Sequence, residues 1–277
     1  MIVIGSRGSK LALWQSHHVK SLLEKAGIEA RIEIIQTTGD KITDVPLARL
    51  GAETSTKGLF TKEIEDALLV HQVDLAVHSM KDMPTELPEG LRIAAVPPRE
   101  EVRDALIGLK LAELPQGARV GTSALRRQAQ LKAFRPDLLI ESVRGNVDTR
   151  LRKLDEGQFD VILLAAAGLR RLGWEDRIAE LVPMDIICPA VGQGALAIET
   201  RDGDTRFDFL NDPFTQHAVD IERSFLRAMG GGCQVPMGAH FDGQTFQCIV
   251  AEPDGSRLRR FSGSGDDVVE RALKAVQ

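Results

Sequence analysis

Short apolar stretches alternate with helical patterns along most of this chain, and this alternation constrains the fold more than any other feature of the sequence. An apolar stretch begins at Ile2, and a helical pattern with Val19, Leu22 and Leu23 on one side follows it. The stretch 159–165 is almost continuously apolar, as in a strand that is buried on both faces of a sheet. Strands that alternate with helices in this way predict α/β units built around parallel sheets.

Breaks in this pattern divide the chain into three parts. The prolines Pro97-Pro98 interrupt both helices and strand ladders, which predicts a linker over 97–101. The stretch 188–194 also interrupts the alternation and is expected to cross back between domains. The polar stretch 41–58 is expected to be a lid or a disordered loop. The predicted domains are an α/β domain from 1–96 plus 194–212, a second α/β domain from 101–188, and a small α+β domain from 217–277.

Composition and charge narrow the possible functions. The 277 residues carry a formal net charge of −5, which argues against a protein that binds nucleic acid by neutralising phosphates. No stretch approaches the ~20 apolar residues of a membrane span. The strand pattern that starts at Met1 is not preceded by a basic leader, and the three cysteines lack paired spacing. We therefore expect a cytoplasmic protein with no nucleic-acid or membrane partner, in which any anion site is local.

One cysteine is presented in an unusual way. Cys233 follows the glycine run 230–232, directly after an amphipathic helical pattern. Glycines leave the backbone bare and free to turn, so the thiol can be held at a surface or in a cleft, where covalent chemistry is possible. The alternative is a small buried apolar side chain, which is the usual role of a free cysteine. Cys188 and Cys248 lie at or within strand patterns and are expected to be structural.

The middle of the chain concentrates arginines at junctions between strands and helices. Arg126, Arg127, Arg144 and Arg150 all lie within a turn or two of such a junction. In doubly wound sheets these junctions line one crevice, where helix N-termini add N–H donors for anions. The alternative is a solvated basic helix face. Several arginines at these points in an acidic protein favour a site for carboxylates or phosphates.

The first α/β part has polar residues at the matching positions. Lys81 and Asp82 come directly after a strand pattern, and Arg7 and Ser9 lie at the first strand-to-helix turn. An opposite-charge pair on a loop is often only a surface feature. Among so many cations, however, Asp82 should stay ionised and could stabilise a developing positive charge.

Other catalytic signatures are absent from the sequence. It contains no Walker loop, no GxGxxG, no HExxH and no CxxC, and its six histidines lack the spacing of metal ligands. No metal site is therefore expected.

Several blocks, in order along the whole chain, resemble the porphobilinogen deaminase family, also called hydroxymethylbilane synthase. They are Arg7-Gly8-Ser9 with Leu11-Ala12-Leu13-Trp14-Gln15, His78-Ser79-Met80-Lys81-Asp82-Met83-Pro84, Gly121-Thr122-Ser123-Ala124-Leu125-Arg126-Arg127-Gln128, Val143-Arg144-Gly145-Asn146-Val147-Asp148-Thr149-Arg150-Leu151, Pro189-Ala190-Val191-Gly192-Gln193-Gly194-Ala195, and Gly231-Gly232-Cys233-Gln234-Val235-Pro236.

The resemblance implies a monomeric enzyme that condenses four porphobilinogen molecules head to tail and releases ammonia each time. It also implies the fold class α/β, with two doubly wound domains like those of periplasmic binding proteins and a third small α+β domain. Cys233 would carry a dipyrromethane cofactor through a thioether. Asp82 would contact pyrrole N–H groups and stabilise the cationic azafulvene. The implied cofactor- and substrate-binding residues are Arg7, Ser9, Gln15, Ser79, Lys81, Thr122, Ser123, Arg126, Arg127, Arg144, Gly145, Arg150, Arg171 and Gln193.

Two departures from the family pattern stand out. Ala124 occupies a position where many relatives have a second serine, and the C-terminal domain is short for the family. Neither departure involves Asp82 or Cys233.

Two other classes of protein share parts of this pattern. Two α/β domains joined by crossing segments are also the plan of anion-binding proteins of the periplasmic type, which would bind a ligand reversibly and have no use for Cys233. A thiol enzyme could use Cys233 as a nucleophile with His240, but no orienting carboxylate is evident in the sequence.

Overall fold

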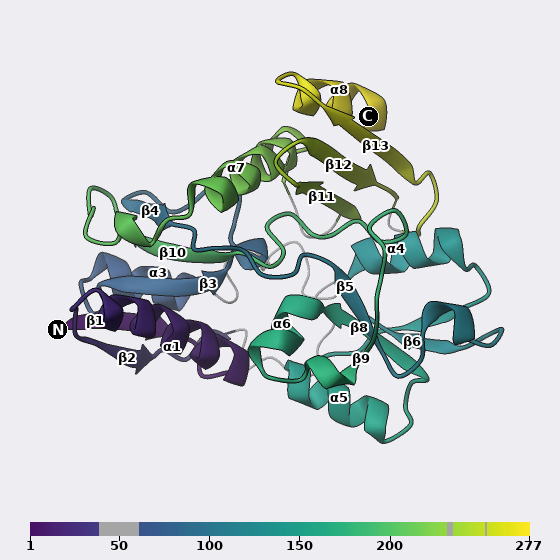
Figure 1. Ribbon diagram of the computed structural model, residues 1–277, viewed down its shortest axis with the longest axis horizontal. Coiled ribbons are helices and arrows are strands. Elements are labelled where there is room, and N and C mark those ends of the chain that lie inside the picture. Colours follow the sequence, from purple (N-terminus) through teal and green to yellow (C-terminus); the bar gives the residue numbers. More distant parts are fainter. Residues whose placement is uncertain (39–60, 232–234, 253) are drawn as a thin grey trace. The chain divides into compact units, whose positions relative to one another are not determined.

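The structure is a computed structural model, shown in Figure 1, and it describes residues 1–38, 61–231, 235–252 and 254–277. The predicted lid stretch 41–58 and Cys233 both lie outside the described residues. The chain divides into two compact units: residues 1–99 with 195–216, and residues 100–194 with 217–277. The small C-terminal sheet belongs to the second unit, and the predicted division into three domains stays a prediction.

The first unit is built on a five-stranded sheet. Its strands are β1 (Ile2–Ser6), β2 (Ala30–Ile34), β3 (Leu75–Ser79), β4 (Leu91–Ala95) and β10 (Leu196–Arg201), in the order β2-β1-β3-β10-β4. β1 runs parallel to β2 and β3, whereas β10 runs antiparallel to β3 and β4. The late strand β10 therefore enters between strands from the start of the chain.

Helices cover both faces of this sheet. On one face, α1 (Lys10–Lys25) packs Val19 and Leu23 into a core with Leu75 of β3. On the other face, α3 (Lys62–Leu69) packs against Ala76, the next residue of that strand. Successive residues of a strand point to opposite faces of the sheet, so Leu75 packs against one helix and Ala76 against the other. Ser9 caps α1 by accepting a hydrogen bond from the Ala12 N–H.

The second unit repeats this topology. Its strands β5 (Asp104–Ile107), β6 (Arg119–Gly121), β7 (Leu139–Glu141), β8 (Val161–Ala165) and β9 (Ile178–Leu181) lie in the order β7-β6-β8-β5-β9. β6 is parallel to β7 and β8, and β5 is antiparallel to β8 and β9. The apolar stretch 159–165 is the buried strand β8 with its approach, as predicted. Each sheet thus has one antiparallel strand, β10 or β5, whose partner strands lie far from it in the sequence.

Helices also lie on both faces of the second sheet. α4 (Leu125–Phe134) packs Leu131 into one core, and α5 (Val147–Asp155) with α6 (Ala166–Arg171) packs Leu151 and Leu169 into the core on the other face. Sheets covered on both faces confirm the predicted doubly wound α/β class.

The C-terminal part of the chain forms the predicted small α+β layer. An antiparallel sheet of β11 (Met237–Phe241), β12 (Thr245–Val250) and β13 (Arg259–Ser264) packs against α7 (Pro213–Ala228) and α8 (Val268–Val276). Phe225 of α7 meets Phe246 of β12 edge to face, with ring centroids 5.5 Å apart. Short 3-10 turns complete the structure at Met80–Asp82, Leu111–Glu113, Glu175–Arg177 and Asp208–Leu210.

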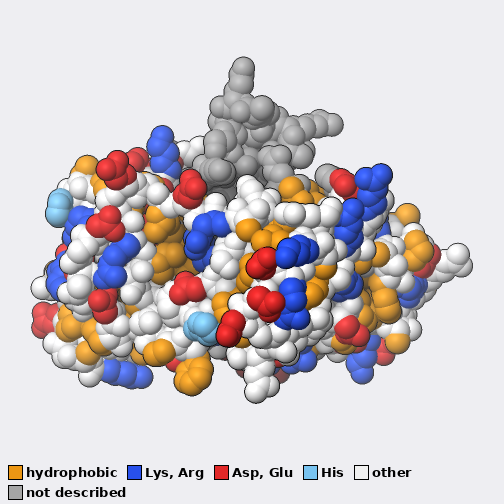
Figure 2. All heavy atoms as spheres, turned by 90° about the horizontal axis from the view of Figure 1, so that it is seen from above, with side chains coloured by type: hydrophobic (Ala, Val, Ile, Leu, Met, Phe, Trp, Pro, Cys, Tyr) orange, Lys and Arg blue, Asp and Glu red, His pale blue; other side chains and the backbone are white. Residues whose placement is uncertain are grey.

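The surface carries both signs of charge. On the face shown in Figure 2, Lys and Arg side chains are interspersed with Asp and Glu, and apolar side chains lie between them. In the described residues, no helix combines the length and the apolar character that crossing a membrane requires.

Candidate functional site

The residues predicted to act in the first unit gather at one edge of its sheet. Because β1 and β3 are parallel neighbours, in register from Ile4 with Leu75, their carboxyl ends lie at the same edge. Arg7 and Ser9 follow β1, and the turn with Asp82 follows β3. We call this group, comprising Arg7, Ser9, Gln15, Ser79, Lys81 and Asp82, the Asp82 cluster.

The turn that presents Asp82 is anchored on both sides. Residues Met80–Asp82 form one 3-10 turn, in which Met80 is buried and its N–H donates to the Ala195 carbonyl at 3.0 Å. Gln15 of α1 is buried and donates from Nε2 to the Ser79 Oγ at 2.9 Å. Asp82 itself is exposed. The turn is therefore fixed while the carboxylate remains accessible to a ligand.

The residues predicted to act in the second unit gather at the matching edge of the second sheet. β7, β6 and β8 are parallel neighbours, so their carboxyl ends lie at one edge of the sheet. Ser123 follows β6 and Arg144 follows β7, and α6 begins directly after β8 at the same edge. Ser123 Oγ donates to the Val143 carbonyl at 2.6 Å and ties two of these junctions together. We call this group, comprising Thr122, Ser123, Arg126, Arg127, Arg144, Gly145, Arg150, Arg171 and Gln193, the arginine cluster.

Two helix N-termini point their backbone N–H groups toward this edge. Among the described residues at these ends, Ala124 at α4 and Asn146 at α5 provide no side-chain cap. First-turn N–H groups that lack a cap can serve an anion. Gly145 has a φ of 106°, and a Cβ there would lie 2.7 Å from Cγ2 of Thr149, so only glycine fits the turn into α5. The Gly145 carbonyl in turn accepts Arg150 Nε at 2.8 Å.

Arg126 and Arg127 are not on an open surface. Both are buried, and each donates to a different oxygen of the fully buried Asp104, at 2.8 Å from Arg126 Nη2 and 2.7 Å from Arg127 Nη2. Arg126 Nη1 also donates to the Cys188 carbonyl, and Arg127 Nη1 donates to the Leu163 carbonyl. Burial alone would raise the pKa of Asp104, but the two guanidiniums hold it well below its usual range.

Gln193 and Arg171 make hydrogen bonds that involve residues 193–194, where the chain passes from the second unit back to the first. Gln193 is fully buried and donates from Nε2 to Asp104 Oδ1 at 2.8 Å and to the Val102 carbonyl at 2.6 Å. Arg171, at the end of α6, donates to the Gly194 carbonyl at 2.6 Å, and burial lowers its pKa to about 10. Both residues therefore hold the backbone near residues 193–194.

Sequence reasoning missed two buried carboxylates of the second unit. Asp104 was unrecognised, although a charged residue that opens an apolar strand pattern could have signalled it. Glu222 of α7 is fully buried and accepts from the Gly192 N–H at 2.7 Å and from the Phe241 N–H at 3.0 Å. It also lies 3.2 Å from Nδ1 of His240, so that histidine does have a carboxylate partner.

The two described cysteines are buried free thiols. Burial raises the pKa of both Cys188 and Cys248 to about 12, so neither forms a thiolate at neutral pH. Nothing in the described residues tests Cys233. No group of three or more metal-ligating side chains occurs in the part of the chain that the structure describes.

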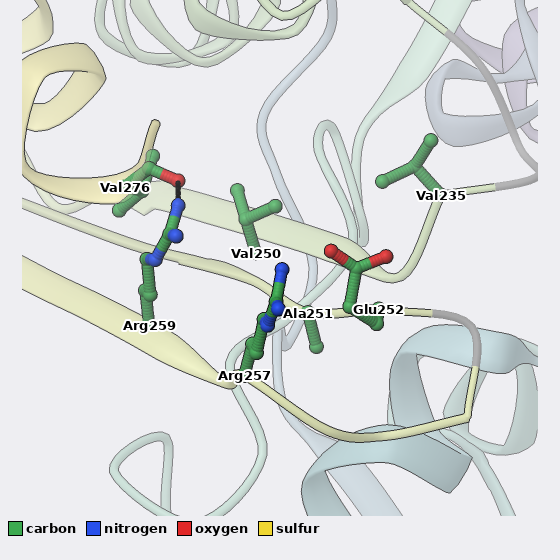
Figure 3. Close-up of a pocket in the computed structure, with 7 residues that line it drawn as sticks. All are labelled: Val235, Val250, Ala251, Glu252, Arg257, Arg259 and Val276. Atoms are coloured by element: carbon green, nitrogen blue, oxygen red, sulfur yellow. Dashed lines mark hydrogen bonds between the residues drawn. The ribbon is translucent and has the colours of Figure 1, made fainter.

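A cavity of about 250 Å³ lies in the small C-terminal layer of the second unit. Val250, Arg257 and Val276 contribute to its lining, and Figure 3 shows Arg259 donating to the Val276 carbonyl at 2.9 Å. It contains no predicted site residue that the structure describes.

Two sheets of one topology, each with polar residues just beyond its parallel strands, define a class of α/β protein that holds small ligands at those edges. Two family models match the chain: the porphobilinogen deaminase dipyrromethane cofactor binding domain over residues 2–208, and the porphobilinogen deaminase C-terminal domain over residues 217–276. The chain belongs to the porphobilinogen deaminase family.

Curated relatives agree with this assignment. The porphobilinogen deaminase of Syntrophobacter fumaroxidans is 52% identical, with 99% of this chain and 91% of the relative covered. That of Geobacter sulfurreducens is 53% identical, covering 95% and 85%. Among solved structures, a periplasmic substrate-binding protein of an ABC transporter from Coxiella burnetii is similar, with 13% identity, a TM-score of 0.43, and 80% of this chain and 91% of that chain covered.

These comparisons confirm the family, the class of transferases of tetrapyrrole biosynthesis and the dipyrromethane cofactor that the sequence indicated. The roles of the individual residues stay predictions.

Proposed function

We propose that this chain is a hydroxymethylbilane synthase. It joins four porphobilinogen molecules head to tail onto a covalent primer, with loss of ammonia at each step, and then releases the linear tetrapyrrole by hydrolysis. Asp82 is the catalytic carboxylate, Cys233 attaches the cofactor, and the Asp82 and arginine clusters bind the acidic side chains of the pyrroles. The observation that supports this most is the arginine cluster at the carboxyl edge of β6, β7 and β8.

The arginine cluster matches the charge of the substrate. Each pyrrole unit carries an acetate and a propionate, so a growing chain accumulates carboxylates. Around Asp104, the two guanidiniums of Arg126 and Arg127 face a single carboxylate, which leaves a surplus of positive charge. Charge-assisted hydrogen bonds to a carboxylate contribute roughly 1.5 to 3 kcal/mol each. The uncapped N-termini of α4 and α5 can add neutral donors.

The residues present also fit the cofactor. Arg127 Nε is buried and, among the described residues, has no hydrogen-bond partner, so it retains a donor for a carboxylate. When bound, the dipyrromethane group supplies the primer to which the first substrate unit is joined. Arg127, Ser123 and Arg144 would hold its acidic side chains, and Cys233 would supply the sulfur of the thioether.

Asp82 would act on the reacting pyrrole. As ammonia leaves the aminomethyl carbon of porphobilinogen, positive charge spreads into the ring and its N–H. A carboxylate held close to that N–H stabilises this charge, and it can pass on the proton that the coupled ring later loses. The anchored turn at Met80 keeps the exposed carboxylate in place, so little reorganisation is needed during the reaction.

Intact mass tests the covalent primer. The purified protein should exceed its sequence mass by two deaminated porphobilinogen units, and Cys233→Ala should lack this surplus. A parent protein that stays unmodified after incubation with porphobilinogen would favour a reversible binding protein instead.

Kinetics test the role of Asp82. Asp82→Asn should keep the cofactor mass but lose roughly 10²- to 10⁴-fold in kcat, the range typical of a general acid-base group. Glu86→Gln is the matched control, because Glu86 is also exposed and lies only a few residues further along. Equal activity of the two variants would remove Asp82 from the mechanism.

We also propose that the enzyme is a cytoplasmic monomer. The free thiols of Cys188 and Cys248 fit a reducing compartment. Light scattering of the holoprotein should give the mass of one chain at every concentration tested, and a mass that rises with concentration would contradict the monomer.

A further inference from the structure

Asp104 is a buried carboxylate to which neither the family resemblance nor the proposed chemistry gives a task. We propose that Asp104 is a positioning residue: it orients the Arg126 and Arg127 guanidiniums so that they can receive substrate and cofactor carboxylates. This inference rests on the proposed function and deepens it.

The place of Asp104 in the sheet brings it to the edge where the site forms. It is the first residue of β5, which runs antiparallel to β8, and it pairs with Ala165, the last residue of β8. Side chains that follow β6, β7 and β8 converge at that edge. Asp104 therefore meets the first turn of α4, where Arg126 and Arg127 lie.

The two oxygens of the Asp104 carboxylate accept hydrogen bonds from different side chains. Within the described residues, Oδ2 accepts from Arg126, whereas Oδ1 accepts from Arg127 and from Gln193. Each guanidinium has a second fixed contact, to the Cys188 carbonyl for Arg126 and to the Leu163 carbonyl for Arg127. Two contacts on one planar group fix its orientation, so the direction of the remaining N–H donors is set before a ligand arrives.

The two arginines have different capacities for a ligand. In the described part of the chain, Arg127 Nε is buried without a hydrogen-bond partner. Arg126 also makes two side-chain hydrogen bonds, to Asp104 and to the Cys188 carbonyl, and its Nε is not among the buried atoms left without a partner. Arg127 is therefore the arginine whose direction toward a carboxylate depends most on Asp104.

Charge explains why a carboxylate is needed in this position. Two guanidiniums held side by side in a buried site repel each other, and one carboxylate between them removes most of that repulsion. Burial lowers the pKa of Arg126 while the carboxylate opposes this effect, as expected for such a balance. The surplus of one positive charge remains for an anionic ligand.

The test is Asp104→Asn, which keeps the shape of the side chain and removes its charge. Asparagine has an NH2 group in place of one carboxylate oxygen. This group cannot accept a hydrogen bond from a guanidinium, so the arginines lose their alignment. For the holoprotein, we expect KM for porphobilinogen to rise about 10- to 100-fold, as for the loss of an aligned charge-assisted hydrogen bond, with kcat changed by less than about 3-fold. Apoprotein should also gain the cofactor mass at least about 10-fold more slowly, by intact mass.

Leu106→Ala on the same strand is the matched control for stability. Leu106 is fully buried, so its truncation destabilises β5 without changing any charge. We expect a lower Tm with wild-type KM and loading rate. The proposal is overturned if Leu106→Ala raises KM as much as Asp104→Asn does, or if Asp104→Asn has wild-type KM and loading.

A second variant tests the proposal even if Asp104→Asn does not fold. Asp104→Glu keeps the charge balance but moves the carboxylate by one methylene, so it should fold and still raise KM. Wild-type KM in a folded Asp104→Glu protein overturns the proposal. If the wild type itself forms no product from porphobilinogen and gains no cofactor mass, the proposed function fails and this inference fails with it. An active wild type with an unaffected Asp104→Asn variant refutes only the positioning role.

Discussion

Gly238→Ala should destabilise the second unit because β11 lies directly against the segment that carries Cys188. A Cβ at Gly238 would lie 2.5 Å from the Pro189 carbonyl oxygen, 2.9 Å from the Cys188 carbonyl oxygen and 3.0 Å from Cδ of Arg126. Two of these neighbours are backbone atoms, so no change of rotamer relieves the contact. Either the strand or the segment must move by several tenths of an ångström or more.

Overpacking of this kind costs about 1 to 3 kcal/mol. For a chain of this size each kcal/mol lowers Tm by roughly 2 to 4 °C, so Tm should fall by roughly 2 to 12 °C in differential scanning calorimetry. The Cys188 carbonyl also accepts from Arg126, so a displaced segment should disturb that guanidinium and raise KM for porphobilinogen.

Gly263→Ala is the control for this substitution. Gly263 lies in β13 of the same sheet, and a Cβ there would lie 2.8 Å from Cζ of Phe261. That neighbour is the far end of a side chain, which can turn aside, so the cost should stay below about 1 kcal/mol. If both variants have the Tm of the parent, β11 does not press on the 188–189 backbone and the reasoning is refuted.

Three further predictions follow from other parts of the structure. In the folded apoprotein at pH 8, a thiol reagent should label Cys233 but neither Cys188 nor Cys248, whose pKa values burial raises to about 12, and all should react after unfolding. A side-chain hydrogen bond from Arg103 lowers the pKa of Glu101 to about 2 in the folded state. Its contribution to stability is therefore fully present above its unfolded pKa of ~4.3 and is lost as the pH falls from there through about 2. Glu101→Gln should therefore reduce the fall in unfolding free energy between pH 5 and pH 2, measured by urea titration, and an unchanged pH profile would contradict this. Gly145→Ala combines a φ of 106° with a side-chain clash, so it should lower Tm and weaken porphobilinogen binding, and a variant with the parent's KM would show that this turn tolerates a side chain.

Local patterns were enough to predict the elements that depend on neighbours in the sequence. The helix α5 follows from such patterns, because its apolar spacing and the glycine at 157, just after its end, are both local signals. The buried strand β8 was predicted from its apolar run. Junction positions placed Ser123 and Arg144 at one edge, because parallel strands end on the same side.

The contacts of Arg126 and Arg127 could not be predicted in the same way. They depend on β5, a strand of four residues that was not recognised because its partners lie at 161–165 and 178–181. Without β5, both arginines were expected to line an open crevice. The structure instead buries them against Asp104, whose role is set by the sheet order and not by any local pattern.

The antiparallel strand of each sheet explains where buried charge is found. In the first unit, β10 brings the fully buried Glu199 to 2.9 Å from Nε2 of His78. Glu199 lies inside β10, which runs from Leu196 to Arg201, so its partner is a side chain of the neighbouring strand β3. In the second unit, β5 brings Asp104 to the last pair of its ladder, where the neighbouring side chains come from the next strand-to-helix junction. The same topology thus yields an internal pair in one sheet and contacts with the predicted ligand-binding arginines in the other. The difference is the position of the carboxylate along its strand, which is why a change at Asp104 should alter ligand binding as well as stability.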